Sequence, residues 1–320
     1  MRKPYLLFAS LCASLLATTS GVSAQEKPPL KIVVGFPPGG PMDHLARLLA
    51  EGMRKDFSTI VVENKPGAAG RIAMQQVKNA KPDGQTLILT PSGLTVVYPH
   101  TFKKLGYDAT KDFTPISLIA RFQFVVVAGP SAQAKSIQDM VLQAKASPGS
   151  LTYGTPGLGT LPQFVGIMIE QTAGVRLNHV PFQGTAPAKA ALFGGHIGYS
   201  FDVAAEMAEP YRAGKVRILA VTGPKRDPLL PEVPTLMESG IPVDATAWFA
   251  VYAPAGLAPD SQARLEQAVA RAVKNPGMLE RLNQLGYEPV GSSAAELAAT
   301  QQQDLAKWEK PLKAAGLILD

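Results

Sequence analysis

The chain has little of what most catalytic and metal sites need. Its 320 residues include one cysteine, Cys12, and four histidines, His44, His100, His179 and His196. The histidines form no HExxH motif and no close pair, which argues against a metal site. A GxSxG elbow is also missing, which argues against a serine hydrolase. We therefore expect no metal, no cofactor and no catalytic residue.

Long apolar runs are absent after the N-terminus, because no later segment reaches 18 consecutive apolar residues. Arg2 and Lys3 precede an apolar stretch at 5–17, and small residues occupy 22–24. This pattern predicts a signal peptide at 1–24 and therefore a secreted protein. Cys12 lies inside that segment, so we expect a mature chain without disulfides or a cysteine nucleophile.

Charge is neither strong nor clustered. The formal net charge is +6, and removal of Arg2 and Lys3 leaves 29 basic and 25 acidic residues, a net charge of +4. A nucleic-acid surface needs clustered basic residues with interleaved aromatics, so we expect no nucleic-acid partner. A small positive surplus suits an anionic ligand.

Short β-branched runs alternate with amphipathic segments along the chain, which predicts α/β layers with mostly parallel sheets. The expected helices are 42–53, 136–146, 161–172, 186–193, 261–275 and 293–315, the last two packed on the outside of a lobe. The expected strands are 30–34, 59–63, 86–90, 116–120, 124–128, 151–153, 178–180, 198–201, 217–221 and 247–252. Segments 124–130 and 247–254 are candidates for two crossings between lobes.

Two loops carry the strongest functional signal, because each joins a strand to a helix through glycine and proline. Bare amides at a helix start, together with the helix dipole, form an anion site. An ordinary strand-to-helix turn is the competing interpretation of each loop, and two such loops in one chain favour binding. The candidate ligand-binding residues are Phe36, Pro38, Gly39, Gly40, Met42 and Asp43 in the first loop, and Thr155, Gly157, Gly159, Thr160 and Gln163 in the second.

Three further places are expected to contribute to the same site. The turn at 181–187 opens another helix, with Gly184, Thr185 and Ala186 as candidates and Thr185 as its N-cap. Ser92 and Asp202 each follow a strand, and α/β proteins collect binding residues at the carboxyl ends of strands. For Asp202 we favour ligand hydrogen bonding over acid–base work.

Several segments resemble one known family, the Bug or TctC-like periplasmic receptors of tripartite tricarboxylate transporters. The similarity covers almost all of the chain after residue 24, in the right order. The matching segments are FPPGG at 36–40 with Asp43, VENKPG at 62–67, KPDG at 81–84, KDFTP at 111–115, FD at 201–202, AVT at 220–222, VPT at 233–235, and WF at 248–249 with APAG at 253–256.

The resemblance implies a type II periplasmic-binding-protein fold, with two α/β lobes and a ligand cleft between them. It places the protein in the periplasm and implies a small carboxylate ligand, with membrane subunits of the transporter or a sensor kinase as partners. We assign residues 25–125 and 250–320 to a discontinuous first lobe and 126–249 to the second, and we expect a monomer.

The chain departs from the family pattern at its loops. Pro41-Met42 stands where a hydroxyl residue commonly precedes the aspartate, and Phe182-Gln183-Gly184 stands where Tyr-Lys-Gly is usual. Because these changes remove hydroxyls and a cation, we hypothesise a ligand less polar than a tricarboxylate, such as an aromatic or branched monocarboxylate. Two alternatives remain: a sensor component, and a secreted enzyme whose base would be Asp202 or His179.

Overall fold

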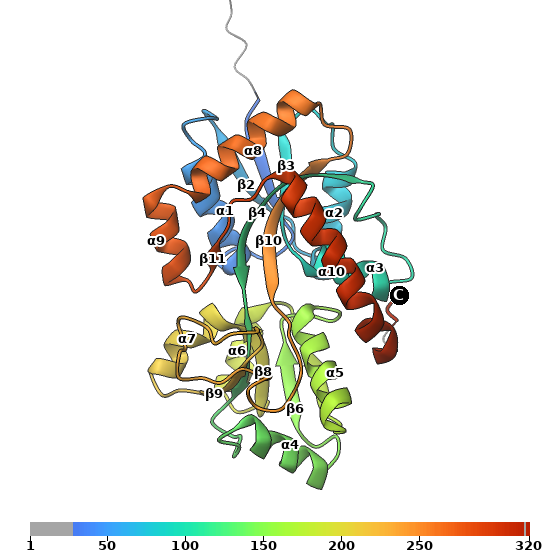
Figure 1. The fold of residues 1–320 in the computed structure, drawn as a ribbon, viewed down its shortest axis with the longest axis vertical. Coiled ribbons are helices and arrows are strands. Elements are labelled where there is room, and N and C mark those ends of the chain that lie inside the picture. Colours follow the sequence, from blue (N-terminus) through green and yellow to red (C-terminus); the bar gives the residue numbers. More distant parts are fainter. Residues whose placement is uncertain (1–27, 317) are drawn as a thin grey trace, which may run out of the picture.

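The computed structural model describes residues 28–316 and 318–320, so the predicted signal peptide and Cys12 lie outside the described residues. Two sheets with flanking helices form two lobes, one above the other (Figure 1). The first sheet has the strand order β11-β4-β10-β3-β1-β2, and the second has the order β7-β6-β8-β5-β9.

The first sheet contains β1 (Leu30–Val34), β2 (Ile60–Asn64), β3 (Thr86–Pro91), β4 (Phe113–Phe122), β10 (Ala247–Pro254) and β11 (Glu288–Pro289). Its helices are α1 (Pro41–Gly52), α2 (Arg71–Lys78), α3 (Tyr98–Thr101), α8 (Pro259–Val273), α9 (Pro276–Gln284) and α10 (Ala294–Ala315). A 3-10 turn, η1 (Ala68–Gly70), and a π-helical turn, η2 (Gly93–Val97), complete this half.

The second sheet contains β5 (Phe124–Ala128), β6 (Thr152–Thr155), β7 (Asn178–Pro181), β8 (Tyr199–Val203) and β9 (Arg217–Val221). Its helices are α4 (Ile137–Ala146), α5 (Leu161–Ala173), α6 (Thr185–Phe193) and α7 (Ala204–Arg212). All ten expected strands and all six expected helices are present with small shifts of their ends. The sequence interpretation missed η1, α2, η2, α3, α7, α9 and β11.

Both sheets are mixed, so the expectation of mostly parallel sheets is wrong. β1 pairs in parallel with β2 and β3, whereas β10 pairs antiparallel with both β3 and β4. In the second sheet β6 pairs in parallel with β7 and β8, whereas β5 pairs antiparallel with β8 and β9. The reason is that β5 and β10 enter their sheets from the other lobe, so each runs away from the boundary that its neighbours run towards.

The chain passes between the lobes at two places. β4 ends at Phe122 in the first sheet, and β5 begins at Phe124 in the second. It returns after β9 through a long loop that leads into β10 (Figure 1). β5 and β10 thus belong whole to one sheet each, whereas the predicted lobe boundaries at 125/126 and 249/250 fall inside these strands.

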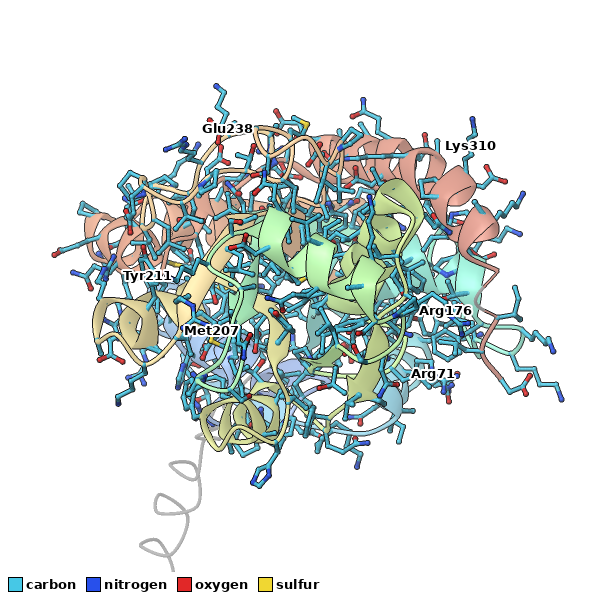
Figure 2. The ribbon with its side chains drawn as sticks, turned by 90° about the horizontal axis from the view of Figure 1, so that it is seen from below. Arg71, Arg176, Met207, Tyr211, Glu238 and Lys310 are labelled. Carbon is cyan, nitrogen blue, oxygen red and sulfur yellow. The ribbon has the colours of Figure 1, made fainter. Side chains whose placement is uncertain are left out.

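Continuous apolar strands supply the core. Ile32, Val33 and Val34 of β1 are fully buried, and residues 247–253 of β10 are at most 2% exposed. Buried runs without alternation are expected of strands covered on both faces. Apart from the buried Asp43, Asp202 and Asp227, the charged side chains of the described residues are at least partly exposed. Arg176, Glu238 and Lys310 occupy well-separated places on the periphery (Figure 2). Among the described residues, no helix has the length and apolarity needed to cross a membrane.

Candidate functional site

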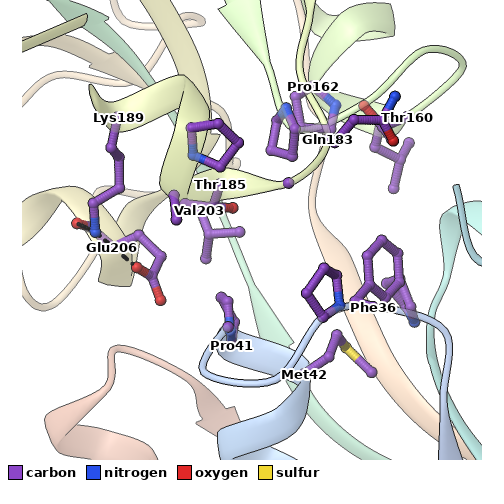
Figure 3. Close-up of a pocket in the computed structure, with 18 of the residues that line it drawn as sticks. Phe36, Pro41, Met42, Thr160, Pro162, Gln183, Thr185, Lys189, Val203 and Glu206 are labelled. Carbon is purple, nitrogen blue, oxygen red and sulfur yellow. Dashed lines mark hydrogen bonds and ion pairs between the residues drawn. The ribbon is translucent and has the colours of Figure 1, made fainter. Parts of the chain in front are cut away.

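A cavity of about 540 Å³ lies between the two lobes, and residues of both lobes line it (Figure 3). The chain reaches it after β1, β3, β6, β7 and β8, and at the β4–β5 crossing and the start of β10. Carboxyl ends of strands are the usual place for ligand sites in α/β proteins. Its walls come from residues 36–42, Pro91, Gly93, Leu94, Tyr98, Phe122, Phe124, Pro156, 160–162, 183–187, Lys189, Ala190, Phe193, Val203, Glu206 and Phe249.

The start of α1 forms one wall. Phe36, Pro41 and Met42 lie on this side of the cavity (Figure 3). Behind them Asp43 is 3% exposed, and its Oδ2 accepts hydrogen bonds from the Gly39 amide and from Arg47 Nε, both at 3.0 Å. Burial disfavours its charge, but the hydrogen bonds from Arg47 and Gly39 outweigh that effect and lower the pKa of Asp43. Asp43 therefore holds the loop in place and does not line the cavity.

The start of α5 lies on the opposite wall, with Thr160 and Pro162 (Figure 3). The Gln163 side chain turns back and accepts a hydrogen bond from the Gly159 amide at 2.6 Å. Thr160 is the N-cap residue, but its hydroxyl donates to the Gly157 carbonyl at 2.7 Å and makes no cap. The Thr160 hydroxyl and the Gln163 side-chain amide thus hydrogen-bond the backbone of their own loop.

The start of α6 is the third helix terminus at the cavity. Its N-cap is Gly184, at φ +113°, and not Thr185 as expected. Only glycine adopts such a backbone at little cost. The Thr185 hydroxyl donates instead to Asp202 Oδ1 at 3.3 Å, an oxygen that also accepts from the Val203 amide at 2.8 Å.

Asp202 is fully buried behind this wall. Burial raises its pKa to about 7, and the hydrogen bond from Val203 only partly offsets that effect. Its second oxygen, Oδ2, has no hydrogen-bond partner among the described residues. A proton on Oδ2 would remove the cost of an unpaired buried charge.

One ion pair lines the cavity. Lys189 Nζ on α6 lies 3.0 Å from Glu206 Oε2 on α7, and the two side chains are 25% and 23% exposed (Figure 3). Lys189 Nζ also donates to the Glu206 carbonyl at 3.3 Å. No other charged residue lines the cavity in the described part of the chain, so the wall carries no net charge.

Aromatic side chains form the back of the cavity at the crossing between lobes. The rings of Phe122 and Phe249 stack at 4.1 Å with an interplanar angle of 17°, and Phe124 meets Phe122 edge-on at 5.3 Å. All three line the cavity, and sequence reasoning missed them as site residues. The signal was present, because Phe124 and Phe249 lie within the segments that were expected to cross between lobes, and Phe122 lies just before the first of them.

Of the sixteen predicted ligand-binding residues, nine lie in the cavity wall: Phe36, Pro38, Gly39, Gly40, Met42, Thr160, Gly184, Thr185 and Ala186. Their contact with a ligand stays a prediction. The other seven do not reach the wall, namely Asp43, Ser92, Thr155, Gly157, Gly159, Gln163 and Asp202. All seven are buried, and several of their side chains hydrogen-bond backbone groups.

Two of those seven show how this happens. Ser92 is 1% exposed and its Oγ accepts from the Trp248 amide at 3.4 Å. Thr155 is fully buried, and its hydroxyl contacts the Gly157 carbonyl at 3.1 Å and His179 Nε2 at 2.7 Å.

The two side chains suggested as the base of a secreted enzyme also lie behind the wall. Neither Asp202 nor His179 lines the cavity. Burial lowers the pKa of His179 to about 4, and its contact with Thr155 keeps it inside the lobe. Within residues 28–316 and 318–320, no group of His, Cys, Asp or Glu has the arrangement of a metal site.

Two α/β lobes with facing strand ends, and a cavity that three helix starts enclose, define the chain as a solute-binding protein of the periplasmic-binding-protein type. Residues 45–317 match the TctC family, described as the tripartite tricarboxylate transporter family receptor, and the chain belongs to this family.

Relatives and solved structures agree with this assignment. A protein encoded in the tcbD-tcbE intergenic region of Pseudomonas sp. strain P51 is 32% identical over 93% of this chain and 90% of its own length. The periplasmic binding protein BugD is 33% identical with a TM-score of 0.84, over 91% of this chain and 98% of that one. Rpa4515 of R. palustris, solved with adipate, is 31% identical with a TM-score of 0.86, over 90% and 97% of the two chains.

Proposed function

We propose that this chain is a periplasmic receptor that captures a small carboxylate between its lobes for uptake by a tripartite tricarboxylate-type transporter. The observation that carries the proposal is the convergence of the starts of α1, α5 and α6 on one cavity between the lobes. Such starts bind anions through free amides and the helix dipole. The adipate bound to Rpa4515 supports the same ligand class.

The magnitudes suffice for useful affinity. A hydrogen bond to a charged group contributes about 1.5–3 kcal/mol, and a helix start adds about 0.3–1 kcal/mol. Three or four such contacts supply the roughly 8 kcal/mol of micromolar binding after the ordering costs. On these magnitudes, binding of the carboxylate does not require a metal ion. The Lys189–Glu206 pair adds no net charge, so the amides carry the electrostatic attraction.

The nine wall residues predicted from the sequence are part of this proposed site, together with Phe122, Phe124, Phe249 and the Lys189–Glu206 pair. Closure of the lobes about the β4–β5 and β9–β10 crossings would enclose the ligand. We further propose that residues 1–24 are a signal peptide, that the mature protein is a monomer, and that membrane subunits of the transporter receive the ligand.

The test is a thermal-shift screen of the purified protein with mono-, di- and tricarboxylates, followed by calorimetric titration. A ligand at one hundred times its Kd stabilises the folded state by about 2.7 kcal/mol, which gives a clear rise in Tm. The proposal fails if no organic acid raises the Tm.

A matched pair of variants shows where the ligand binds. Gly184→Ala strains the α6 start at the cavity, and we expect it to weaken binding. Gly149→Ala also places alanine at a positive φ, +77°, but lies outside the cavity wall, so it should leave binding unchanged. Equal losses of affinity in the two variants would argue against a site at α6.

A further inference from the structure

The cavity extends beyond the helix starts along one face of α6. Ala186, Lys189, Ala190 and Phe193 all line it, at the spacing i, i+3, i+4 and i+7 of a single helical face. Seven residues of helix span about 10 Å. A ligand whose carboxylate lies at the α6 start therefore has a second region of wall beside it, which ends at Phe193.

Phe193 is the most exposed phenylalanine in the described part of the chain. It is 37% exposed, although a phenylalanine normally buries most of its ring. Its position in the wall of the cavity supplies a reason, because an apolar ligand end would cover the exposed part of the ring.

The charged side chains in this second region of the wall, which ends at Phe193, determine what kind of ligand group it accepts. Lys189 is the one cation of the wall within the described residues, and Glu206 Oε2 already lies 3.0 Å from its Nζ. A second ligand carboxylate near Lys189 would have to lose its hydration shell, and it would also face the negative charge of Glu206. An apolar ligand end meets no such cost.

From this arrangement, and given the proposed function, we infer that the preferred ligand is an amphipathic monocarboxylate. Its carboxylate is held at the helix starts, and its apolar body lies along α6 to Phe193. The specificity-determining residues are Lys189, Phe193 and Glu206. They select against a second carboxylate and favour a body longer than that of a four-carbon acid.

The experiment uses two acids of equal length. Octanoate and suberate both have eight carbons and differ only in the distal carboxylate, so calorimetric titration of the purified protein with each isolates the second charge. We expect octanoate to bind about tenfold tighter than suberate, and tighter than butyrate. If suberate binds as tightly as octanoate, or butyrate as tightly as octanoate, the inference is overturned while the proposed function stands. If none of these acids binds but another organic acid raises the Tm, the inference is likewise overturned and the proposed function stands; if no organic acid does, the proposed function itself fails.

Three variants assign the effect to the named residues. Phe193→Ala should weaken octanoate binding about threefold, whereas Leu142→Ala, which removes a 64% exposed side chain of α4 outside the cavity, should not. Glu206→Gln frees Lys189, so we expect suberate to gain about tenfold relative to octanoate. Lys189→Met should widen the preference for octanoate. Unchanged octanoate-to-suberate ratios in both charge variants would show that the pair does not select the ligand, and unchanged Tm values without ligand confirm that the variants fold.

Discussion

The Thr185 hydroxyl donates a hydrogen bond to Asp202 Oδ1 at 3.3 Å and thereby connects the wall of the cavity to a fully buried carboxyl group. Thr185 lies in the first turn of α6, so the charge of Asp202 acts on the helix start that we propose for anion binding. Because burial raises the pKa of Asp202 to about 7, we expect both stability and ligand binding to depend on pH near neutrality.

The first prediction concerns stability. Burial raises the pKa of Asp202 from 3.8 to about 7, so the folded protein keeps a proton that the unfolded chain has lost above about pH 4. This contribution to stability is full below pH 4 and is lost as the pH rises to 7, by up to about 1.4 kcal/mol per pH unit. Asp202→Asn removes the titration. Urea unfolding of both proteins at pH 5 to 8 should show a difference in unfolding free energy that shifts in favour of the variant with rising pH.

The same group predicts a pH dependence of binding. Above pH 7 an ionised Asp202 places a negative charge behind Thr185, so the affinity for a carboxylate should fall. In Asp202→Asn this decrease between pH 6 and 8 should disappear, as measured by calorimetric titration. A decrease of the same size in the variant would contradict a role for Asp202.

The second prediction concerns the loop before α1. Asp43→Ala leaves the Gly39 amide without its partner, so we expect a loss of about 1–3 kcal/mol of unfolding free energy together with weaker ligand binding. Arg47 is 58% exposed, and Arg47→Ala should cost less than about 1 kcal/mol. Because the pKa of Asp43 is lowered in the folded protein, its contribution is present above about pH 4 and is lost as the pH falls further. Equal unfolding midpoints for the two variants in urea would contradict this assignment.

The third prediction separates helix propensity from packing. An added Cβ at Gly166 of α5 would lie 2.5 Å from the hydroxyl oxygen of Tyr153, a ring that is 2% exposed and held by its neighbours. Gly166→Ala should therefore destabilise the protein by about 1–3 kcal/mol, although alanine is the better helix former. In α9, a Cβ at Gly277 meets nothing closer than 3.4 Å, so Gly277→Ala should be neutral or slightly stabilising. Thermal unfolding of the two variants checks both signs.

The fourth prediction concerns the aromatic back wall. Phe249 is 2% exposed and stacks on Phe122, so Phe249→Ala should cost about 3–5 kcal/mol of unfolding free energy. Phe193 is 37% exposed, and Phe193→Ala should change stability by less than about 0.5 kcal/mol. Urea unfolding without ligand measures both. A large loss of unfolding free energy in Phe193→Ala would mean that the Phe193 ring stabilises the fold and is not available for ligand contact.

The positions of most helices and strands could be predicted because the pattern of neighbouring residues indicates them. The apolar run of β1, the turn at 35–40 and the amphipathic α1 follow one another within a few residues. The elements that were missed are short or have weak patterns. The two-residue β11 pairs only with β4, and α7 contains Pro210. Their formation depends on partners that are distant in sequence.

The candidate site could be predicted only in part. The loops at 36–42, 160–162 and 184–187 reach the cavity, since glycine and proline mark such turns locally. Polar residues of the same loops were assigned to the ligand, yet Asp43 and Gln163 hydrogen-bond the amides of Gly39 and Gly159. Sequence cannot tell whether a hydroxyl or carboxylate faces a ligand or its own loop, because both arrangements satisfy the same hydrogen-bonding group.

The sequence by itself determined the α/β alternation, the glycine- and proline-rich helix starts and the resemblance to a receptor family. Each of these consists of short patterns of consecutive residues along the chain. Only the tertiary structure decided that Phe122 stacks on Phe249, that Lys189 pairs with Glu206 and that Asp202 is buried. These relationships join residues from different strands and helices. Their distance, burial and charge exist only once the chain has brought those elements together.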